Sequence, residues 1–225
     1  MGDFKPASIY VGVMELFTVL LPGAFLAAGI LFALPGAYLA QLLASLPTDA
    51  AQWVAFLFCA YALGAFVFPA AALLDETYSP YRKWQTRRRA DHAYNRATAL
   101  RCAFLGAPIK DAKADNPMNT FKWAKSMLML QAPAAYADVQ RHEAESKFFR
   151  SLAVALPVVG LLAASRPLDP PLGPPVLASL TLLLIGLSYW RYAEQRFKST
   201  EAAYMHVITL QLGPKPATAP KPSGD

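Results

Sequence analysis

The chain has 225 residues, of which 55% are hydrophobic and 16% are charged. Soluble domains carry about 25% charged residues, so this composition argues against an ordinary soluble protein and favours a membrane protein. The two cysteines, Cys59 and Cys102, are far apart and match no pairing or ligand pattern, which excludes a disulfide scaffold and a cysteine-based zinc site. The net charge of +6 implies that basic residues are concentrated in particular segments.

Four apolar segments predict four transmembrane helices in two hairpins, and hence an all-α membrane protein. Residues 16–34 and 53–74 contain no charged residue and are long enough to cross a hydrocarbon core of about 30 Å. Residues 148–165 and 172–190 have uncharged tracts, 151–165 and 172 or 176 to 190, that fall near the lower limit of this length, so either one alone would also suit a buried helix of a soluble core. The proline-rich residues 166–175 between them predict a turn, which favours the hairpin.

The first and third apolar segments each have a further feature. Residues 16–34 have a cleavable signal peptide as an alternative interpretation, but they are longer than a typical signal core and follow no cationic run. Arg150 falls at the start of the third segment, where we expect its side chain to snorkel toward the lipid headgroups.

The distribution of Lys and Arg predicts the orientation. One precedes the first span, none lies between the first two, fourteen lie between the second and third counting Arg150, one lies in the next loop and five follow the fourth span. By the positive-inside rule, both termini are cytoplasmic, and in a bacterium the membrane is the inner membrane. The predicted regions are 1–74 with the first hairpin, a cytoplasmic basic region 75–147, the second hairpin 148–190, a cytoplasmic helix 191–212 and a disordered tail 213–225.

The basic region lacks the residue alternation of strands and is predicted to be helical. Arg82, Arg89 and Arg96 recur every seven residues, so they share one stripe if the second span continues as a single helix to about residue 104. Asn116-Pro117 predicts the start of the next helix.

Further patterns predict how the later helices pack. Pro133 predicts the start of a helix that runs into the third span. Apolar side chains at 118–130 and a seam at 193–207 need partners, which are either other copies of the chain or each other. Three surface pairs at i,i+4 are expected: Asp138/His142, Arg141/Glu145 and Glu143/Lys147.

The basic side chains are candidates for contact with an anion, a nucleotide or a partner protein. They are Arg82, Arg87, Arg88, Arg89, Arg96, Arg101, Lys122 and Lys125. Contact with anionic lipids is the alternative, and it is strongest near the bilayer, because the attraction fades within about a Debye length. Interleaved aromatic residues, such as Trp84 and Trp123, either stack on bases or belong to a core.

Other candidates lie in or beside the spans. Glu15 is either an ordinary interfacial carboxylate or part of a pore mouth. Pro22, Gly23, Pro69 and Pro157 are expected to serve tight packing or hinge motion. The spans contain no internal charge, which argues against a proton-coupled or ion-coupled transporter but is compatible with a pore that gates by dewetting.

Enzyme chemistry has little support in the sequence. No HExxH, GxSxG, P-loop or GxGxxG motif occurs, and the three histidines are isolated from one another. We therefore expect no catalytic residue, no metal site, no cofactor and a non-enzymatic function.

The order of these parts resembles the small four-span effectors of bacterial antiphage defence, including those of cyclic-oligonucleotide systems and the membrane channel of the Hailong system. The resemblance rests on Leu21-Pro22-Gly23-Ala24 in the first span, the basic helical insertion and RYAEQRFKSTEAAYMHVI after the fourth span, and it covers the architecture of about 210 residues. It implies a homo-oligomeric inner-membrane channel gated by an oligonucleotide or a nucleotidyltransferase partner. A non-enzymatic membrane scaffold that recruits an acidic partner is the alternative.

Overall fold

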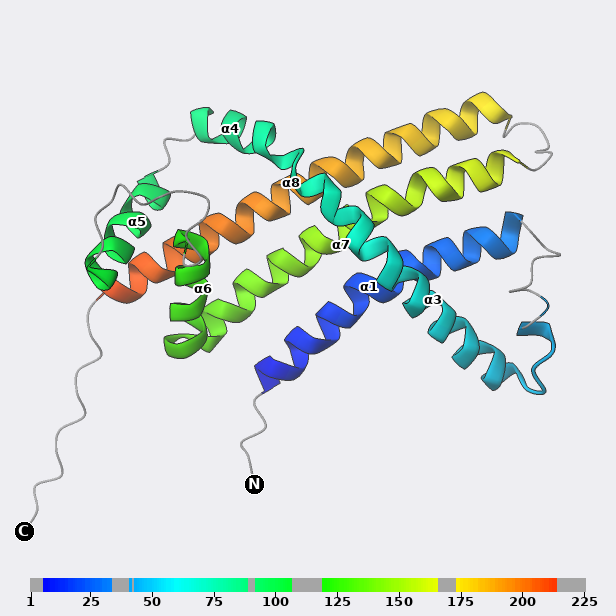
Figure 1. Cartoon of the computed structure of the whole chain (residues 1–225), viewed down its shortest axis with the longest axis horizontal. Helices are drawn as coiled ribbons and strands as arrows, with labels where there is room; N and C mark the ends of the chain where they lie inside the picture. The colour runs from blue at the N-terminus through cyan, green and yellow to red at the C-terminus, as the bar shows by residue number, and fades with distance from the viewer. Residues whose placement is uncertain are drawn as a thin grey trace, which may run out of the picture. The chain divides into compact units, whose positions relative to one another are not determined.

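The computed structural model describes residues 6–33, 41, 43–88, 92–106, 119–165 and 173–213. These residues are helical apart from short turns, and no strand occurs among them. In chain order the elements are α1 (Pro6–Ala33), α3 (Asp49–Ala72), the 3-10 helix η1 (Leu73–Asp75), α4 (Tyr78–Arg88), α5 (His92–Leu105), α6 (Thr120–Gln131), α7 (Pro133–Ala164) and α8 (Pro174–Leu212), as Figure 1 shows. Four of them, α1, α3, α7 and α8, are long and apolar enough to cross a membrane, which confirms the predicted helical class and the four apolar helices.

The chain divides into two compact units. Unit 1 comprises Met1–Ala90 and Gln140–Ser199, and unit 2 comprises Asp91–Val139 and Thr200–Asp225. Helices α7 and α8 therefore each contribute to both units.

In unit 1, α1 and α3 pack through small residues. A Cβ added to Gly23 would collide with the carbonyl oxygen of Ala60, and one added to Gly64 would collide with the carbonyl oxygen of Val19. Ala60 and Ala27 are fully buried. The helix backbones approach this closely because Gly and Ala leave room that larger side chains would fill.

Two further glycines set close contacts of α7 within unit 1. A Cβ on Gly29 of α1 would lie 2.8 Å from a Val159 methyl group, and one on Gly160 would lie 2.6 Å from Cγ2 of Thr181 on α8. Figure 1 shows α7 and α8 side by side here. Glycine thus marks contacts of α1 with α3, of α1 with α7 and of α7 with α8.

Unit 2 has its own hydrophobic core. Its buried members are Ala97 of α5, Trp123, Ala124, Met127 and Leu128 of α6, Val139 of α7, and Ala203, Tyr204 and Val207 of α8. The apolar sector predicted at 118–130 thus packs, through residues 123–128, against the C-terminal part of the predicted 193–207 seam within one chain. These buried faces are consequently not available to join subunits.

Several predicted boundaries need correction. The N-cap of α6 is Asn119, whose Oδ1 accepts a hydrogen bond from the Lys122 amide at 2.9 Å; Asn116-Pro117 lies outside the described residues. The fourth span and the helix after it form the single helix α8, because nothing in the apolar-to-polar transition near residue 190 breaks a helix. Helix α5 ends at Leu105, and the next residue, Gly106, has a φ of 63°, which suits glycine. The expected turn at 166–172 and the tail at 214–225 also lie outside the described residues.

The predicted surface pairs are partly right. Arg141 pairs with Glu145 at 3.2 Å and Lys147 with Glu143 at 3.3 Å. The Asp138/His142 pair is wrong, because each residue bonds to α8 instead. Asp138 contacts His206 Nε2 at 3.2 Å, and His142 Nδ1 lies 2.9 Å from Gln195 Oε1.

The contact between α1 and α3 predicts that Gly23→Ala lowers the free energy of unfolding by about 1–3 kcal/mol, because the added methyl group meets backbone atoms that must move apart. Thermal unfolding in detergent measures the effect. The matched control is Gly186→Ala on α8, where a Cβ meets open space, and where we expect no loss and up to about 1 kcal/mol of gain from reduced backbone entropy. Equal melting temperatures for the two variants would contradict this packing.

The core of unit 2 predicts that Leu128→Ala destabilises the protein by about 2–5 kcal/mol, because a fully buried side chain leaves a cavity. Leu130→Ala, two residues along the same helix, changes stability by less than about 0.5 kcal/mol because that side chain is 79% exposed. Limited proteolysis of residues 119–139 reports the difference. A similar cleavage rate in both variants would show that α6 does not pack as described.

Candidate functional site

The end of α3 is a defined turn that places an acidic side chain directly after an apolar helix. The hydroxyl of Thr77 donates to the carbonyl of Leu74 at 2.7 Å, and the Thr77 amide contacts the same oxygen at 3.1 Å. These bonds close the turn between η1 and α4. Asp75, the last residue of η1, is thereby held at the end of the second apolar helix.

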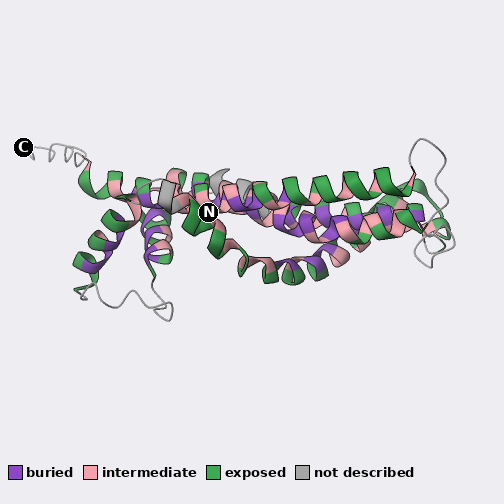
Figure 2. Ribbon diagram, turned by 90° about the horizontal axis from the view of Figure 1, so that it is seen from above, coloured by how far each residue is buried: buried purple, intermediate pink, exposed green. Residues whose placement is uncertain are grey.

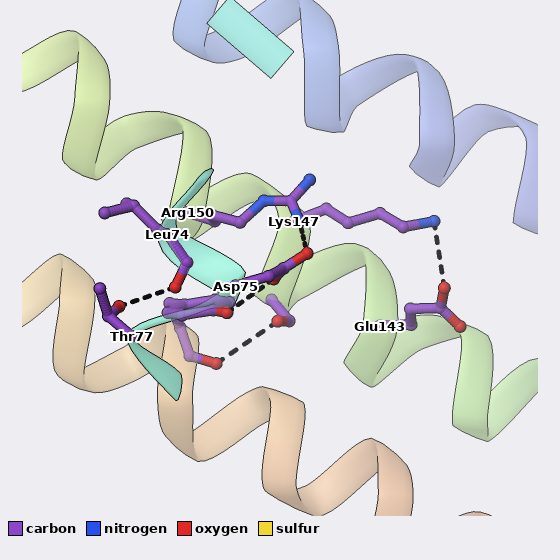
Figure 3. Close-up of polar contacts among 8 residues, drawn as sticks. Leu74, Asp75, Thr77, Glu143, Lys147 and Arg150 are labelled. Atoms are coloured by element: carbon purple, nitrogen blue, oxygen red, sulfur yellow. Dashed lines mark hydrogen bonds and ion pairs between the residues drawn. The ribbon is translucent and has the colours of Figure 1, made fainter. Parts of the chain in front are cut away.

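Both oxygens of Asp75 are bound by the second hairpin, as Figure 3 shows in part. Arg150 Nη1 of α7 donates to Oδ2 at 2.6 Å. The hydroxyl of Tyr192 on α8 donates to Oδ1 at 2.7 Å. One carboxylate therefore joins three helices that are far apart in sequence.

Arg150 is almost completely removed from solvent, with an exposed fraction of 6%. Its guanidinium also lies over the Phe68 ring of α3, 5.2 Å from the centroid, an arrangement that favours a cation. Its Nε is buried with no hydrogen-bond partner. Burying a charge is costly unless it is paired, so the stability of this position depends on Asp75. Arg150 thus pairs with Asp75 instead of snorkelling toward the lipid headgroups as expected from the sequence.

Tyrosines extend the contact on the α8 side. Tyr189 donates its hydroxyl hydrogen to the Thr77 carbonyl at 2.9 Å, and its ring centroid lies 5.8 Å from that of Tyr192. Tyr78 packs edge-on against Tyr192 with centroids 6.1 Å apart. Burial raises the pKa of Tyr78 to about 12, with partial opposition from Arg82 and Arg196, so this phenol remains neutral at physiological pH. We call Asp75, Thr77, Arg150, Tyr189 and Tyr192 the polar junction.

A second row of polar contacts joins α7 to α8 beside the junction. Ser146 donates its hydroxyl hydrogen to the Tyr192 carbonyl at 3.4 Å, and His142 contacts Gln195 one helical turn further along. Lys147 and Glu143 form their ion pair on the same stretch of α7 (Figure 3). Polar groups therefore continue from the end of the apolar spans along both helices.

The structure separates the predicted basic residues. Arg82 is exposed on α4 in unit 1, whereas Arg96 is exposed on α5 in unit 2, so they do not share a stripe of one described helix. Arg101 is buried, with an exposed fraction of 3%. Arg87 and Arg88 lie on α4, but their side chains are outside the described part of the chain, as is the whole of Arg89.

On α6, two predicted cations have different surroundings. Lys122 is exposed. Lys125 is half-buried, and its ammonium lies 5.6 Å from the centroid of Phe121 and 6.0 Å from that of Tyr136. Lys122 and Arg96 are therefore the exposed cations that unit 2 offers among the predicted contact residues.

The candidate residues within or beside the spans lie on α1, α3 and α7. Pro22 is fully buried inside α1 beside the Gly23 contact, and Pro69 and Pro157 lie inside α3 and α7. Glu15 falls on α1, and its side chain is outside the described part. Each of these three helices continues through its proline without interruption.

The sequence interpretation missed the polar junction, although a signal was present. Asp75 directly follows one uncharged apolar segment, and Arg150 directly precedes another. Two opposite charges at the same end of adjacent spans are expected to pair when the alternative is burial alone. Tyr192 gave no such signal, because an aromatic residue at a span end is normal in any membrane helix.

No protein family, curated protein or solved structure matches the chain. Among the described residues, no group of three or more His, Cys, Asp or Glu side chains is arranged to hold a metal ion.

The junction predicts strong coupling between Asp75 and Arg150. In a double-mutant cycle with Asp75→Asn and Arg150→Gln, we expect a coupling free energy of about 1–2 kcal/mol, below the value for a fully buried pair because the Asp75 side chain is 39% exposed. The control cycle uses Arg191 and Glu194, which form an ion pair at 2.8 Å on one helix surface and should couple by less than about 0.5 kcal/mol. Both are measured by unfolding in detergent. Equal coupling in the two cycles would remove the special role of the junction.

Proposed function

We propose that this chain is a multi-pass protein of a bacterial inner membrane that assembles with copies of itself into a pore controlled from the cytoplasm. One observation carries the proposal: only 17–33% of the residues in each apolar window are buried within the chain. Figure 2 shows exposed residues along the long helices. Apolar surface of this extent is unstable in water and requires lipid or further copies of the protein.

Self-association supplies a conducting path that one chain lacks. Within unit 1, α1 and α3 meet through Gly23, Ala60 and Gly64 at backbone contact, which leaves no room for water at this contact. Large side chains of α3, including Trp53, Phe58 and Phe66, point away from this contact and are more than half exposed. The path therefore forms between copies, lined by apolar side chains that gate by dewetting.

The polar junction is the control element of this proposal. When Asp75 is bound by Arg150 and Tyr192, α3 is fixed to α7 and α8, and the pore is closed. Loss of these bonds releases the end of α3, which gives the discrete second state that gating requires. The partly exposed carboxylate is open to competition from water and from other cations.

The signal acts through the basic residues of unit 2. Arg96 and Lys122 are exposed cations on a unit with its own core, and cations of this kind attract phosphate groups and acidic protein surfaces. By resemblance to four-span antiphage effectors, the signal is an oligonucleotide or a nucleotidyltransferase partner. Opening of the pore depolarises an infected cell.

A membrane scaffold is the second candidate, and the same core of unit 2 favours it. A folded basic unit joined to membrane helices recruits an acidic protein without any conduction. The two functions differ in ion flux, which only the pore supports.

The pore predicts signal-dependent ion flux in liposomes that contain the purified full chain. Oligonucleotides, or the product of a neighbouring nucleotidyltransferase gene, should open it. Charge reversal of Arg96→Glu together with Lys122→Glu should reduce the response about tenfold or more, because two attractions become repulsions. The control, Arg191→Glu with Lys198→Glu, makes the same change in net charge on α8 and should retain the response.

Two results would count against this proposal. Absence of flux from inserted, oligomeric protein under every signal would transfer the function to the scaffold. An equal loss of response in the control pair would show that total charge matters and not the basic surface of unit 2.

A further inference from the structure

A groove of about 430 Å³ lies between α1, α3 and α7 in unit 1. It is lined mainly by Gly12, Leu16 and Val19 of α1, Tyr61 and Phe68 of α3, and Lys147 of α7. The volume falls within the range of small-molecule sites in proteins. The lining combines apolar side chains with the polar groups of Thr18, Tyr61 and Lys147, so it suits an amphiphile.

The groove runs lengthwise along the helices. Tyr61 and Phe68 are seven residues apart on α3, which corresponds to roughly 10 Å along the helix axis. Phe68 is seven residues from Asp75, where the polar junction marks the end of the apolar helix. The part of the groove that α3 lines thus lies roughly 10 to 20 Å from this end along the helix axis, within a hydrocarbon core of about 30 Å.

The cation lies at the level expected for a lipid phosphate. Lys147 is one turn of α7 outside Arg150, on the polar side of the junction. Its ammonium is 3.3 Å from Glu143. Because an ammonium carries three N–H donors, it can bridge this carboxylate and a phosphate oxygen.

The packing of α1 explains why the groove exists. Helix α1 is held at Gly23 by α3 and at Gly29 by Val159 of α7, both toward its C-terminal end. Thr18 of α1 borders both this groove and a smaller hollow of about 190 Å³ on the α7 side. In a membrane, acyl chains are the material available to fill such space.

We propose that this groove is a binding site for one anionic phospholipid, with an acyl chain along Leu16, Val19, Tyr61 and Phe68 and the headgroup phosphate on Lys147. The lipid fills the space between α1, α3 and α7 that the groove leaves open. It is also next to Phe68, whose ring lies under Arg150, so the bound lipid supports the polar junction. Lipid binding here does not depend on whether the assembled protein conducts ions.

The test measures lipid retained per chain by native mass spectrometry. The purified full chain is delipidated in detergent and given equal amounts of phosphatidylglycerol and phosphatidylcholine. We expect one saturable lipid per chain and about a fivefold preference for phosphatidylglycerol, the factor that one cation near anionic lipid provides.

Two pairs of variants localise the site. Gly12→Leu adds a side chain at a lining position of the groove where a Cβ meets nothing within 4 Å, and should reduce retention about tenfold, because it displaces the contacts of about two methylene groups. Gly186→Leu makes the same change at another open position, on α8, and should bind normally. Lys147→Gln should abolish the headgroup preference and Lys147→Arg should keep it, whereas Lys198→Gln, which removes the cation of a similar i,i+4 pair, should leave it unchanged.

Three outcomes would overturn the proposal. Equal retention by Gly12→Leu and Gly186→Leu would place the bound lipid elsewhere. Equal binding of the two phospholipids by the unmodified chain would remove Lys147 from recognition. Displacement of phosphatidylglycerol by millimolar inorganic phosphate alone would show a phosphate site that needs no acyl chain.

Discussion

The ion pair between Asp75 and Arg150 is the constraint on which the arrangement of unit 1 depends. Its carboxylate ends the second apolar helix, and its guanidinium lies on the third, so the pair joins the two predicted hairpins. Tyr192 adds the fourth apolar helix through the same carboxylate. An arginine this deeply buried destabilises the fold without its ion-pair partner. The position of the end of α3 is therefore coupled to α7 and α8.

The apolar part of unit 1 is held together in a different manner. Glycine lets α1 approach α3 at Gly23 and α7 at Gly29, but these contacts lie in the second half of α1. The first half borders two hollows, and the larger one extends to Lys147. The larger hollow therefore lies next to α7 near the polar junction, because Lys147 is one helical turn from Arg150. This proximity is the physical reason that a lipid in the groove affects the junction.

The features that could be predicted from the sequence are those that depend on the composition of a single segment. The four apolar helices and the start of α7 at Pro133 follow from local rules of length and proline. The i,i+4 pairs of α7 were predictable only where no other helix competed: Asp138 and His142 bond to α8 instead of to each other. The i,i+4 spacing along one helix does not show whether a side chain on another helix competes for the same partner.

Features that require three-dimensional contact were not predictable. The apolar sectors of α6 and α8 had two possible partners, and only the structure shows Trp123 and Leu128 packed with Val207 inside one chain. The groove depends on the angle at which helices separate, and periodicity does not encode that angle. The predicted basic residues lie in two separate units, so a stripe along one continuous helix was an unsuitable description of them.

Current across a planar bilayer tests the central claim most directly. Purified chain with Asp75→Asn retains the apolar helices but loses the charge that binds Arg150, so the account predicts unitary currents without any added signal, whereas the unmodified chain remains closed. Tyr78→Phe serves as a control, since it removes a neighbouring hydroxyl and leaves Asp75 bound. An Asp75→Asn variant that is inserted and oligomeric yet silent at every voltage would contradict the claim that the polar junction holds a pore closed.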